Sequence, residues 1–480
     1  MDWLDRIARF WPDLVAGFSL LAALCTSIHA VLHKRDSRAA TLWLGFIWFL
    51  PLLGSILYLA LGVNRIRRHA LSLPVQSASG KRRVIPKNMG EPKQPEAEHL
   101  RMLARIVDRV ATRPLTAGNR VQPLVNGDEA FPAMLAAIES AQKSISLSTY
   151  IFDRDSVGHQ FVAALRRAVA RSVAVRVLID DAGARYSWPS IVHELKHAHV
   201  PVARFLPMLT PRRLLTINLR NHRKLLVVDG HIAFTGGMNI RQGNVLAARP
   251  KSPVQDLQFR LEGPVVAQLQ EAFANDWAFC TNEVLDGDSW FPELADCGNI
   301  VARTITDGPD SDFHQVRWTL LAALADAQTS VQIVTPYFLP DPALVSALNL
   351  AALRGVRVDI ILPVQNNLPF VHWASRAMWW QVLEHGCHLW LTPPPFDHSK
   401  LMIVDDHWVL SGSANWDTRS LRLNFELNVE SYGREFAQRM ELVVEQKLRH
   451  AREVTQTEVD GRPFLPRLRD AVARLFLPYL

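Results

Sequence analysis

The sequence predicts an α/β fold in two similar halves, preceded by two helices that cross a membrane. Three observations lead to this prediction. One motif is written twice, at residues 222–239 and again at 398–415. The segments before each copy repeat as well, and each passes from a helical pattern of apolar residues into a short apolar strand. Two long stretches near the beginning of the chain carry no charged residue.

The uncharged stretches are Leu14–Leu32 and Ala39–Val63. Each is near the ~20 residues that a helix needs to cross the hydrocarbon core of a bilayer. Asp2 and Asp5 argue against a cleaved signal peptide, because such peptides begin with basic residues. We therefore expect residues 1–69 to form a membrane anchor, a hairpin of two transmembrane helices.

Basic residues around this hairpin predict its orientation, since Lys and Arg gather on the cytoplasmic side of a membrane. A hairpin places its two flanks on one side, and the flanks hold more basic residues than the turn. We therefore expect the rest of the chain to lie in the cytoplasm. The flanks contain Arg6, Arg9, Arg65, Arg67 and Arg68, and the turn contains Lys34, Arg35 and Arg38.

The remaining chain divides into a linker and two related domains. Residues 70–98 are rich in Ser, Pro, Lys and Glu, which is typical of a linker. We place the first domain at 99–298 and the second at 299–480, because residues 133–152 resemble residues 319–338. Alternating helix and strand predicts α/β layers around an internal sheet in each domain.

The doubled motif carries the chemistry. In each copy a His and a Lys lie two residues apart next to an apolar strand, so both side chains point to the same face. Ammonium groups repel metal ions, and we expect neither a metal nor another cofactor. Two such strands brought together would place two His and two Lys around one anionic group. The copies are His222, Lys224, Asp229, Gly236 and Asn239, and His398, Lys400, Asp405, Gly412 and Asn415.

Exchange of a phosphodiester needs a nucleophile and a proton for the departing alkoxide, and His can supply either. The lysines would hold the phosphate oxygens, and Asn239 and Asn415 can donate hydrogen bonds to the same atoms. Asp229 and Asp405 complete the motif, but each lies seven residues after its His. This odd offset turns them to the other face of a strand, and we expect them to be structural.

The doubled H-x-K-x4-D with its later G-x-x-N resembles the phospholipase D superfamily. Within it, the apolar beginning, NGDEAF at 126–131, NHRK at 221–224 and RSLRLNFELN at 419–428 resemble bacterial cardiolipin synthases. The resemblance implies two pseudo-symmetric phospholipase D-type α/β domains attached to the bacterial inner membrane. It implies a phosphatidyltransferase that makes cardiolipin from phosphatidylglycerol and a second phospholipid through a covalent phosphatidyl-histidine.

The resemblance also implies roles for single residues. Aligning DLQFRLEG with ELNVESYG pairs Asp256 with Glu426, and acids at such positions in the family contact the His of the opposite half. By the same resemblance His222 is the nucleophile and His398 the general acid. The repeat by itself leaves these two roles interchangeable.

One region departs from the family pattern. The run IRQGNVLAARPKSPVQD after the first motif replaces an aspartate- and tyrosine-containing run of the family. Within it, Val254, Gln255 and Asp256 replace a Trp-Arg-Asp sequence. The departures concern the substrate pocket, while the residues of the doubled motif are intact.

A formal net charge of +7 suits an anionic partner, either a nucleic acid or an anionic membrane. Because the expected hairpin confines the site to a membrane, we expect phosphatidylglycerol and the bilayer as partners, no nucleic acid and no obligate protein partner. Three alternatives remain open: a phospholipase that passes the phosphatidyl group to water, a nuclease of the same superfamily, and a non-catalytic lipid-binding protein. The acceptor phospholipid and the oligomeric state remain open as well.

Two further segments allow two interpretations each. The aromatic residues at 370–380 either fill a core or line a substrate channel. From Arg467 the tail has apolar residues on one helical face, which predicts a docked helix or a helix on the membrane surface. Four cysteines show no spacing typical of a metal site or a disulfide framework, and we expect reduced thiols.

Overall fold

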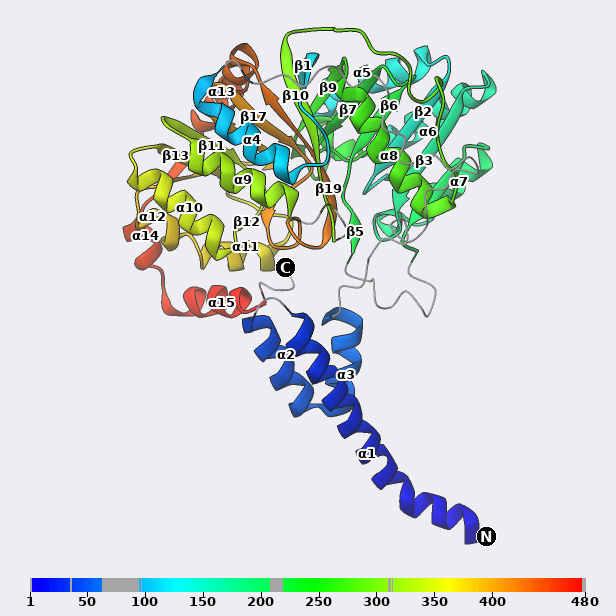
Figure 1. Ribbon diagram of the computed structural model, residues 1–480, viewed down its shortest axis with the longest axis vertical. Coiled ribbons are helices and arrows are strands. Elements are labelled where there is room, and N and C mark those ends of the chain that lie inside the picture. Colours follow the sequence, from blue (N-terminus) through cyan, green and yellow to red (C-terminus); the bar gives the residue numbers. More distant parts are fainter. Residues whose placement is uncertain are drawn as a thin grey trace. The chain divides into compact units, whose positions relative to one another are not determined.

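The chain divides into two compact units in the computed structural model (Figure 1). The smaller contains Met1–Ile66 with Pro207–Leu219, and the larger contains Arg67–Leu206 with Arg220–Leu480. Most of the predicted linker at 70–98 lies outside the described residues. The structure describes residues 2–34, 37–62, 95, 97–207, 219–309, 312 and 314–476.

The smaller unit begins with one long helix, α1 (Asp2–His33). Of the helices in the described residues, it alone is long and apolar enough to cross a membrane, over Phe10–His33. The second predicted transmembrane helix is interrupted, because Leu50 leaves the helical conformation (φ −134°, ψ 76°) and Pro51 has no backbone N–H to donate. The stretch instead forms α2 (Ser37–Phe49), α3 (Pro51–Leu57) and a π-helical turn, η1 (Tyr58–Gly62).

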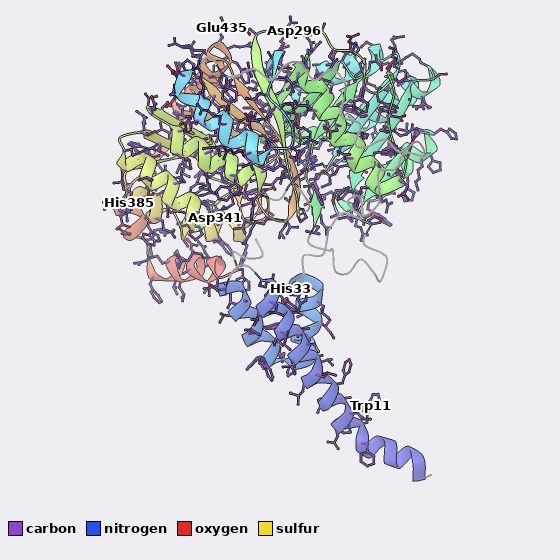
Figure 2. The ribbon with its side chains drawn as sticks, viewed as in Figure 1. Trp11, His33, Asp296, Asp341, His385 and Glu435 are labelled. Carbon is purple, nitrogen blue, oxygen red and sulfur yellow. The ribbon has the colours of Figure 1, made fainter. Side chains whose placement is uncertain are left out.

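Polar contacts join α1 to the segment that follows the break. The hydroxyl oxygens of Thr26 and Ser55 lie 3.1 Å apart, and His29 Nδ1 lies 2.7 Å from the Tyr58 hydroxyl. Large apolar side chains face outward along α1, and Trp11 projects from the helix (Figure 2). An apolar surface around a few internal polar contacts suits a lipid environment.

The larger unit is built on one sheet whose two halves have the same strand order. The first half runs β4-β3-β2-β6-β7-β9-β1, and the second runs β14-β13-β11-β16-β17-β19-β10, with β20 at its outer edge. The halves join where β1 pairs antiparallel with β10. The first-half strands are β1 (Thr116–Val125), β2 (Ser144–Thr149), β3 (Ala174–Asp180), β4 (Val202–Phe205), β6 (Leu225–Val228), β7 (Ile232–Gly236) and β9 (Leu257–Glu262). The second-half strands are β10 (Ile300–Asp307), β11 (Ser330–Val334), β13 (Arg357–Pro363), β14 (His388–Thr392), β16 (Leu401–Val404), β17 (Trp408–Gly412), β19 (Asn424–Tyr432) and β20 (Arg452–Val454).

Pairing inside the two halves is equivalent as well. β2 pairs parallel with β3 and antiparallel with β6, and β11 pairs parallel with β13 and antiparallel with β16. These strands come from the repeated segments of the sequence. The predicted α/β fold in two related halves is therefore confirmed.

Helices cover the sheet and bury an apolar core in each half. One of them crosses the boundary that the repeats suggested. Helix α4 (Arg101–Val110) precedes the first half in sequence but packs on α9, and its Leu103 and Val107 join the core of the second half. The first-half helices are α5 (Asn126–Ser140), α6 (Ser156–Ala170), α7 (Ile191–His197) and α8 (Val265–Thr281). The second-half helices are α9 (Gln315–Asp326), α10 (Pro342–Leu353), α11 (Pro369–Arg376), α12 (Trp380–Leu383), α13 (Arg434–Leu448), α14 (Gln456–Asp460) and α15 (Phe464–Arg474).

Very short strands tie the halves together where the two motifs begin. β5 (Arg220–Asn221) pairs with β19 of the second half, and β15 (Phe396–Asp397) pairs with β8 (Val254–Gln255) of the first. β12 (Phe338–Leu339) pairs with β18 (Trp416–Asp417) inside the second half. Because His222 follows β5 and His398 follows β15, both histidines lie at the junction of the halves. Short 3-10 turns occupy Glu98–Leu100, Gly183–Arg185, Gln242–Asn244 and Leu246–Ala248.

Candidate active site

The two motif histidines are held by the backbone of the opposite half. The N–H of His222 donates to the carbonyl of Phe425 at 2.9 Å, and the N–H of His398 donates to the carbonyl of Gln255 at 2.8 Å. The two contacts are equivalent, since each follows the short pairing of β5 or β15. The junction of the halves thus fixes the position of both imidazoles.

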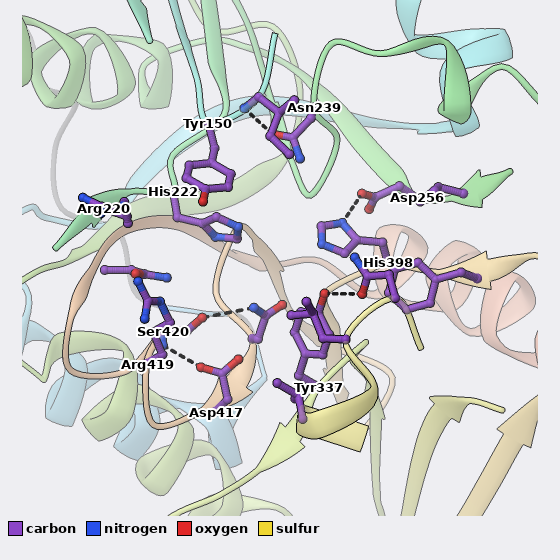
Figure 3. Close-up of a pocket in the computed structure, with 18 of the residues that line it drawn as sticks. Tyr150, Arg220, His222, Asn239, Asp256, Tyr337, His398, Asp417, Arg419 and Ser420 are labelled. Atoms are coloured by element: carbon purple, nitrogen blue, oxygen red, sulfur yellow. Dashed lines mark hydrogen bonds and ion pairs between the residues drawn. The ribbon is translucent and has the colours of Figure 1, made fainter. Parts of the chain in front are cut away.

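A carboxylate from the opposite half orients each imidazole. His222 Nδ1 lies 3.0 Å from Glu426 Oε2, and His398 Nδ1 lies 2.8 Å from Asp256 Oδ2. Because Nδ1 is engaged in both rings, Nε2 is the nitrogen left for a substrate. Both imidazoles face the same space in Figure 3. These are the cross-half contacts that the family resemblance implied for Asp256 and Glu426.

Burial sets the electrostatics of both imidazoles. It lowers the pKa of His222 to about 4, although the carboxylate of Glu426 opposes the shift. Burial and the positive charges of Lys400 and Lys224 lower the pKa of His398 well below its usual value. The lowered pKa therefore favours the unprotonated form of both imidazoles, as a nucleophile or a general base requires.

The two carboxylates differ. Burial raises the pKa of Asp256 to about 7, although the charge of Lys400 opposes the shift. Burial would raise the pKa of Glu426 too, but attraction to His222, the hydrogen bond from that ring and the charge of Lys224 lower it overall. Glu426 is therefore ionised at neutral pH, whereas Asp256 titrates near it.

The motif lysines lie beside the histidines and are almost fully buried. Lys224 Nζ donates to the carbonyl of His222 at 2.6 Å, and Lys400 Nζ donates to the carbonyl of His398. Burial lowers the pKa of Lys224 to about 7 and that of Lys400 to about 8, while nearby carboxylates oppose both shifts. An anion that enters the site would stabilise the charged form of both lysines.

The motif aspartates are turned away from the histidines. The Asp229 carboxylate accepts the backbone N–H groups of residues 142–144, and the Asp405 carboxylate accepts those of residues 328–330. Each aspartate therefore fixes the turn between a helix and the next strand, β2 or β11. Asp229 and Asp405 hold the scaffold and do not line the cavity described next.

A solvent-open cavity of about 190 Å³ connects the two histidines. The motif asparagines line it as expected. Asn239 accepts the N–H of Ile151 at 3.0 Å through its side-chain oxygen, which leaves its amide nitrogen as a donor toward the cavity. Asn415 Nδ2 lies 3.1 Å from Ser420 Oγ.

The cavity also contains a pair of tyrosines that we did not predict. The ring of Tyr150 lies edge-on to His222 with centroids 5.3 Å apart, and Tyr337 lies edge-on to His398 at 6.3 Å. Lys224 Nζ is 5.5 Å from the Tyr150 ring. The two tyrosines are offset by one residue in the repeated segments, because Tyr150 directly follows Thr149 whereas Tyr337 stands two residues after the equivalent Thr335. Comparison of the repeats position by position therefore does not pair them.

Charged residues at a second pair of equivalent positions break the symmetry of the cavity. Arg241 stands two residues after Asn239, and Asp417 stands two residues after Asn415. Both line the cavity, and Arg241 forms an ion pair with Asp153 at 3.2 Å. Burial raises the pKa of Asp417 to about 6. The first half thus presents a cation where the second presents an acid.

Comparison with known proteins agrees with this arrangement. The family model described as cardiolipin synthase, phospholipase D-like domain, matches residues 134–277 and 320–448, one stretch in each half. A second model, described as phospholipase D-nuclease N-terminal, matches residues 21–62. The matched regions thus include both motifs, the C-terminal part of α1 from residue 21, and α2 and α3.

Curated relatives match along nearly the whole chain. A cardiolipin synthase of Oceanobacillus iheyensis is 31% identical over 98% of this chain and 99% of its own. The major cardiolipin synthase of Bacillus subtilis is 32% identical over 97% of this chain and 99% of its own. Among solved structures, a phosphatidylserine synthase of Haemophilus influenzae superposes with a TM-score of 0.61 at 16% identity, over 79% of this chain and 100% of that one. That likeness shows the shared fold, and the sequence matches show that the chain belongs to the bacterial cardiolipin synthases of the phospholipase D superfamily.

Proposed function

We propose that this phosphatidyltransferase makes cardiolipin, moving the phosphatidyl group of phosphatidylglycerol to the hydroxyl of a second phospholipid. The observation that carries the proposal is the convergence of the two motif histidines on one cavity, each bonded to a carboxylate of the opposite half and each with a buried motif lysine beside it. Relatives that match nearly the full chain are cardiolipin synthases, which supports the choice of substrate.

The reaction proceeds in two displacements at phosphorus. The negative charge of the bound phosphate raises the lowered pKa of His398, so that this ring takes up a proton at Nε2. Nε2 of His222 attacks, the bond from phosphorus to the headgroup glycerol breaks, and His398 gives that proton to the departing alkoxide. The hydroxyl of the second lipid then gives its proton to His398 and attacks phosphorus. The nitrogen–phosphorus bond breaks, which releases cardiolipin and restores both histidines.

The different carboxylates support this division of roles. Phosphorylation of His222 at Nε2, with a proton on Nδ1, makes the ring cationic, and the ionised Glu426 stabilises that charge. His398 must release a proton easily. Its partner Asp256 has a raised pKa, so less negative charge holds the protonated ring in place.

The lysines and asparagines stabilise the charge of the transferred group. Lys224 and Lys400 lie on opposite halves and can each take one non-bridging oxygen of the phosphate. The side-chain amides of Asn239 and Asn415 line the same cavity and can add hydrogen bonds. The binding of a phosphate would raise the lowered pKa values of both lysines and keep them charged.

The protein is a membrane protein, and we place it in the bacterial inner membrane with both catalytic halves in the cytoplasm. Support comes from the apolar helix α1 and from the basic residues that follow it. A location against the bilayer also supplies the substrates. Two lipids can reach one cavity by lateral diffusion without leaving their leaflet.

Lipid analysis of the purified protein tests the proposed function. Labelled phosphatidylglycerol in vesicles should give labelled cardiolipin and free glycerol, and added phosphatidylethanolamine reveals whether a second lipid class serves as co-substrate. Phosphatidic acid as the main product under all conditions would assign the protein to the hydrolases instead. Nuclease activity without lipid turnover would overturn the proposal.

A further inference from the structure

The C-terminal helix α15 is attached to the catalytic unit by its polar side. Asp470 is fully buried and forms ion pairs with Arg462 at 3.0 Å, Arg469 at 2.8 Å and Arg376 at 3.5 Å. Ala473, one turn further on, is buried as well. The guanidinium of Arg469 also lies over the ring of Trp373 on α11, 4.5 Å from its centroid. The ion pairs of Asp470 with Arg376, at the end of α11, and with Arg462, just after α14, therefore fix which face of α15 points outward.

The outward face of α15 is apolar, the reverse of an ordinary docked helix. Its apolar residues recur at helical spacing and remain between 45% and 74% exposed. Arg467 and Arg474 lie beside the stripe. We define the α15 stripe as Phe464, Leu465, Leu468, Val472, Leu475 and Phe476.

The stripe leads to the rim of the catalytic cavity. The rings of Phe476 and Phe370 are in contact with centroids 5.5 Å apart. Phe370 starts α11 together with Leu368 and Val371, which line the cavity that holds His222 and His398. Leu368 and Phe370 are themselves 46% and 38% exposed. A continuous apolar path thus joins the α15 stripe to the site.

We infer that the α15 stripe and the exposed side chains of Leu368 and Phe370 insert into the surface of an anionic bilayer and admit lipids sideways to the cavity. The inference rests on the proposed function, because a cavity of about 190 Å³ takes headgroups while the acyl chains need an apolar surface outside it. Arg467 and Arg474 add attraction to anionic headgroups. A helix that shows apolar residues to one side and arginines beside them is typical of such insertion.

Activity on vesicles and activity on a dissolved short-chain lipid distinguish membrane insertion from catalysis. In the full-length protein, the double variant Leu465→Glu, Leu468→Glu should lower activity on phosphatidylglycerol in vesicles at least about tenfold, since two apolar side chains no longer leave water. Activity on short-chain phosphatidylglycerol below its micelle concentration should stay within a factor of two. The control is Leu442→Glu on α13, a leucine that is 56% exposed and outside the stripe. Equal losses on both substrates, or no loss on vesicles, would overturn the inference.

Cross-linking identifies what covers the stripe. A photoreactive residue at position 468 of the reconstituted protein should attach to labelled phosphatidylglycerol, whereas the same probe at position 442 should not. Attachment to residues of α1, α2 or α3 would show that the helices of the smaller unit cover the stripe, and would overturn the inference. Neither result depends on whether the product is cardiolipin or phosphatidic acid, so failure of the proposed function is separately visible.

The smaller unit supports a second inference, which rests on its own contacts. Thr26 meets Ser55 and His29 meets Tyr58, so α3 runs parallel to α1 with a constant offset of 29 residues. The break at Leu50 therefore lies level with residue 21 of α1. From that level α1 continues 12 residues to its C-terminal end, or about 18 Å at the helical rise. The rest of the apolar part of α1, Phe10 to residue 20, extends about 16 Å from that level toward the N-terminus.

The turn between α2 and α3 is itself apolar. Phe49 is 83% exposed and Leu53 is 51% exposed, and no polar side chain lies between them. A Cβ on Gly54 would stand 2.6 Å from the Phe46 carbonyl oxygen, so this glycine permits the close return of the chain. A turn at the water surface would carry polar residues, whereas this one suits the interior of the bilayer.

We propose that α1 crosses the membrane once and that residues 37–62 dip to its middle and return. The N-terminus then lies on the opposite side from the catalytic halves. This topology assigns Arg6 and Arg9 of the sequence to the far side and more basic residues to the catalytic side, in agreement with the positive-inside rule; those are Lys34, Arg35, Arg38, Arg65, Arg67 and Arg68. In sealed inside-out vesicles, protease should remove a C-terminal tag and spare an N-terminal one, and in spheroplasts the reverse. Two tags accessible from the same side would restore the two-span hairpin and overturn the proposal.

Discussion

Glu426 and Asp256 occupy equivalent positions in the two halves, yet different hydrogen bonds reach them. Glu426 accepts the hydroxyl of Ser413 and, at 3.1 Å, the amide of Asn424, in addition to its contact with His222. In the first half the residue equivalent to Ser413 is Gly237, where a Cβ would stand 2.4 Å from Asp256 Oδ1. Asp256 instead accepts a backbone N–H from Leu257 at 2.8 Å.

This difference shows how a duplicated fold can assign unlike roles to like residues. Extra donors stabilise the charged form of Glu426, and burial with fewer donors favours the neutral form of Asp256. An ionised partner favours a histidine that becomes cationic, and a partner that titrates near neutrality favours one that exchanges protons. Three differences between equivalent positions separate the two environments: Gly237 and Ser413, Val254 and Asn424, and Asp256 and Glu426.

Loss of either histidine should have the largest effect and tests whether the halves share one site. His222→Ala and His398→Ala should each lower turnover of phosphatidylglycerol by at least about 10³-fold, because nucleophile and acid are both required. The control is His231→Ala, which removes an exposed histidine next to the first motif. A histidine variant that kept most of its activity would show that each half works alone.

The two histidines should differ toward an activated substrate. A phosphatidyl ester of p-nitrophenol has a leaving group that needs no proton. His398→Ala should therefore release p-nitrophenol in a burst of about one equivalent, because the second displacement still lacks its base, while His222→Ala should release none. The reverse pattern would exchange the two roles and leave the rest of the mechanism in place.

Replacing the carboxylate of Glu426 or of Asp256 by an amide should lower kcat by unequal factors. Glu426→Gln removes an ionised partner and should lower kcat by about 10³-fold or more, as expected when a histidine loses the anion that orients it. Asp256→Asn replaces a carboxyl with a pKa of about 7 and should cost at least about tenfold less. Steady-state kinetics near pH 7 measure both variants. Equal losses would mean that the different hydrogen bonds have no functional consequence.

Arg241 should contribute to the binding of phosphatidylglycerol and not to the chemical steps. Arg241→Gln removes the cation that the first half presents at the position equivalent to Asp417, and should raise KM for phosphatidylglycerol about tenfold with kcat within a factor of three. Arg185→Gln is the control, because Arg185 is also paired with an aspartate, Asp181, but lies outside the cavity. A matching fall in kcat would place Arg241 in the transition state instead.

A smaller shift should follow removal of the hydroxyl that only the second half provides. Ser413→Ala deprives Glu426 of a donor, so its lowered pKa rises. Because activity requires ionised Glu426, the acid limb of the kcat/KM profile should move to higher pH, by roughly one unit for one hydrogen bond to a charged group. Ser431→Ala, which removes a buried hydroxyl on the same strand, should leave the profile in place.

Some of this architecture could be predicted from sequence because it depends on local spacing. The separation of His and Lys on a strand, and the match of Asp256 with Glu426, follow from the repeat itself. The fold in two halves follows from the same repeat. Cross-half contact came from the family resemblance, and the short pairings β5–β19 and β15–β8 supply its physical cause.

Other features depend on packing that the pattern does not encode. The uncharged stretch at 39–63 predicts one helix by composition, but Pro51 and Gly54 allow it to fold back. The tail shows an apolar stripe by its periodicity, yet the buried Asp470 decides that the stripe faces outward. Helix α4 precedes the first half in sequence and packs on the second, since its apolar face complements α9.

Removal of metal ions should have the smallest effect of all. The charge that a metal would neutralise is met by Lys224 and Lys400, one from each half, and two ammonium groups beside the phosphate repel a divalent cation. Vesicle assays with and without excess chelator should therefore give the same rate of phosphatidyl transfer. The lysine variants serve as the positive control: Lys224→Met and Lys400→Met should each lower that rate strongly and by similar factors, because each half supplies one of the two charges. Activity that disappeared with chelator and returned with a divalent ion would contradict the mechanism in which the two lysines neutralise the phosphate charge.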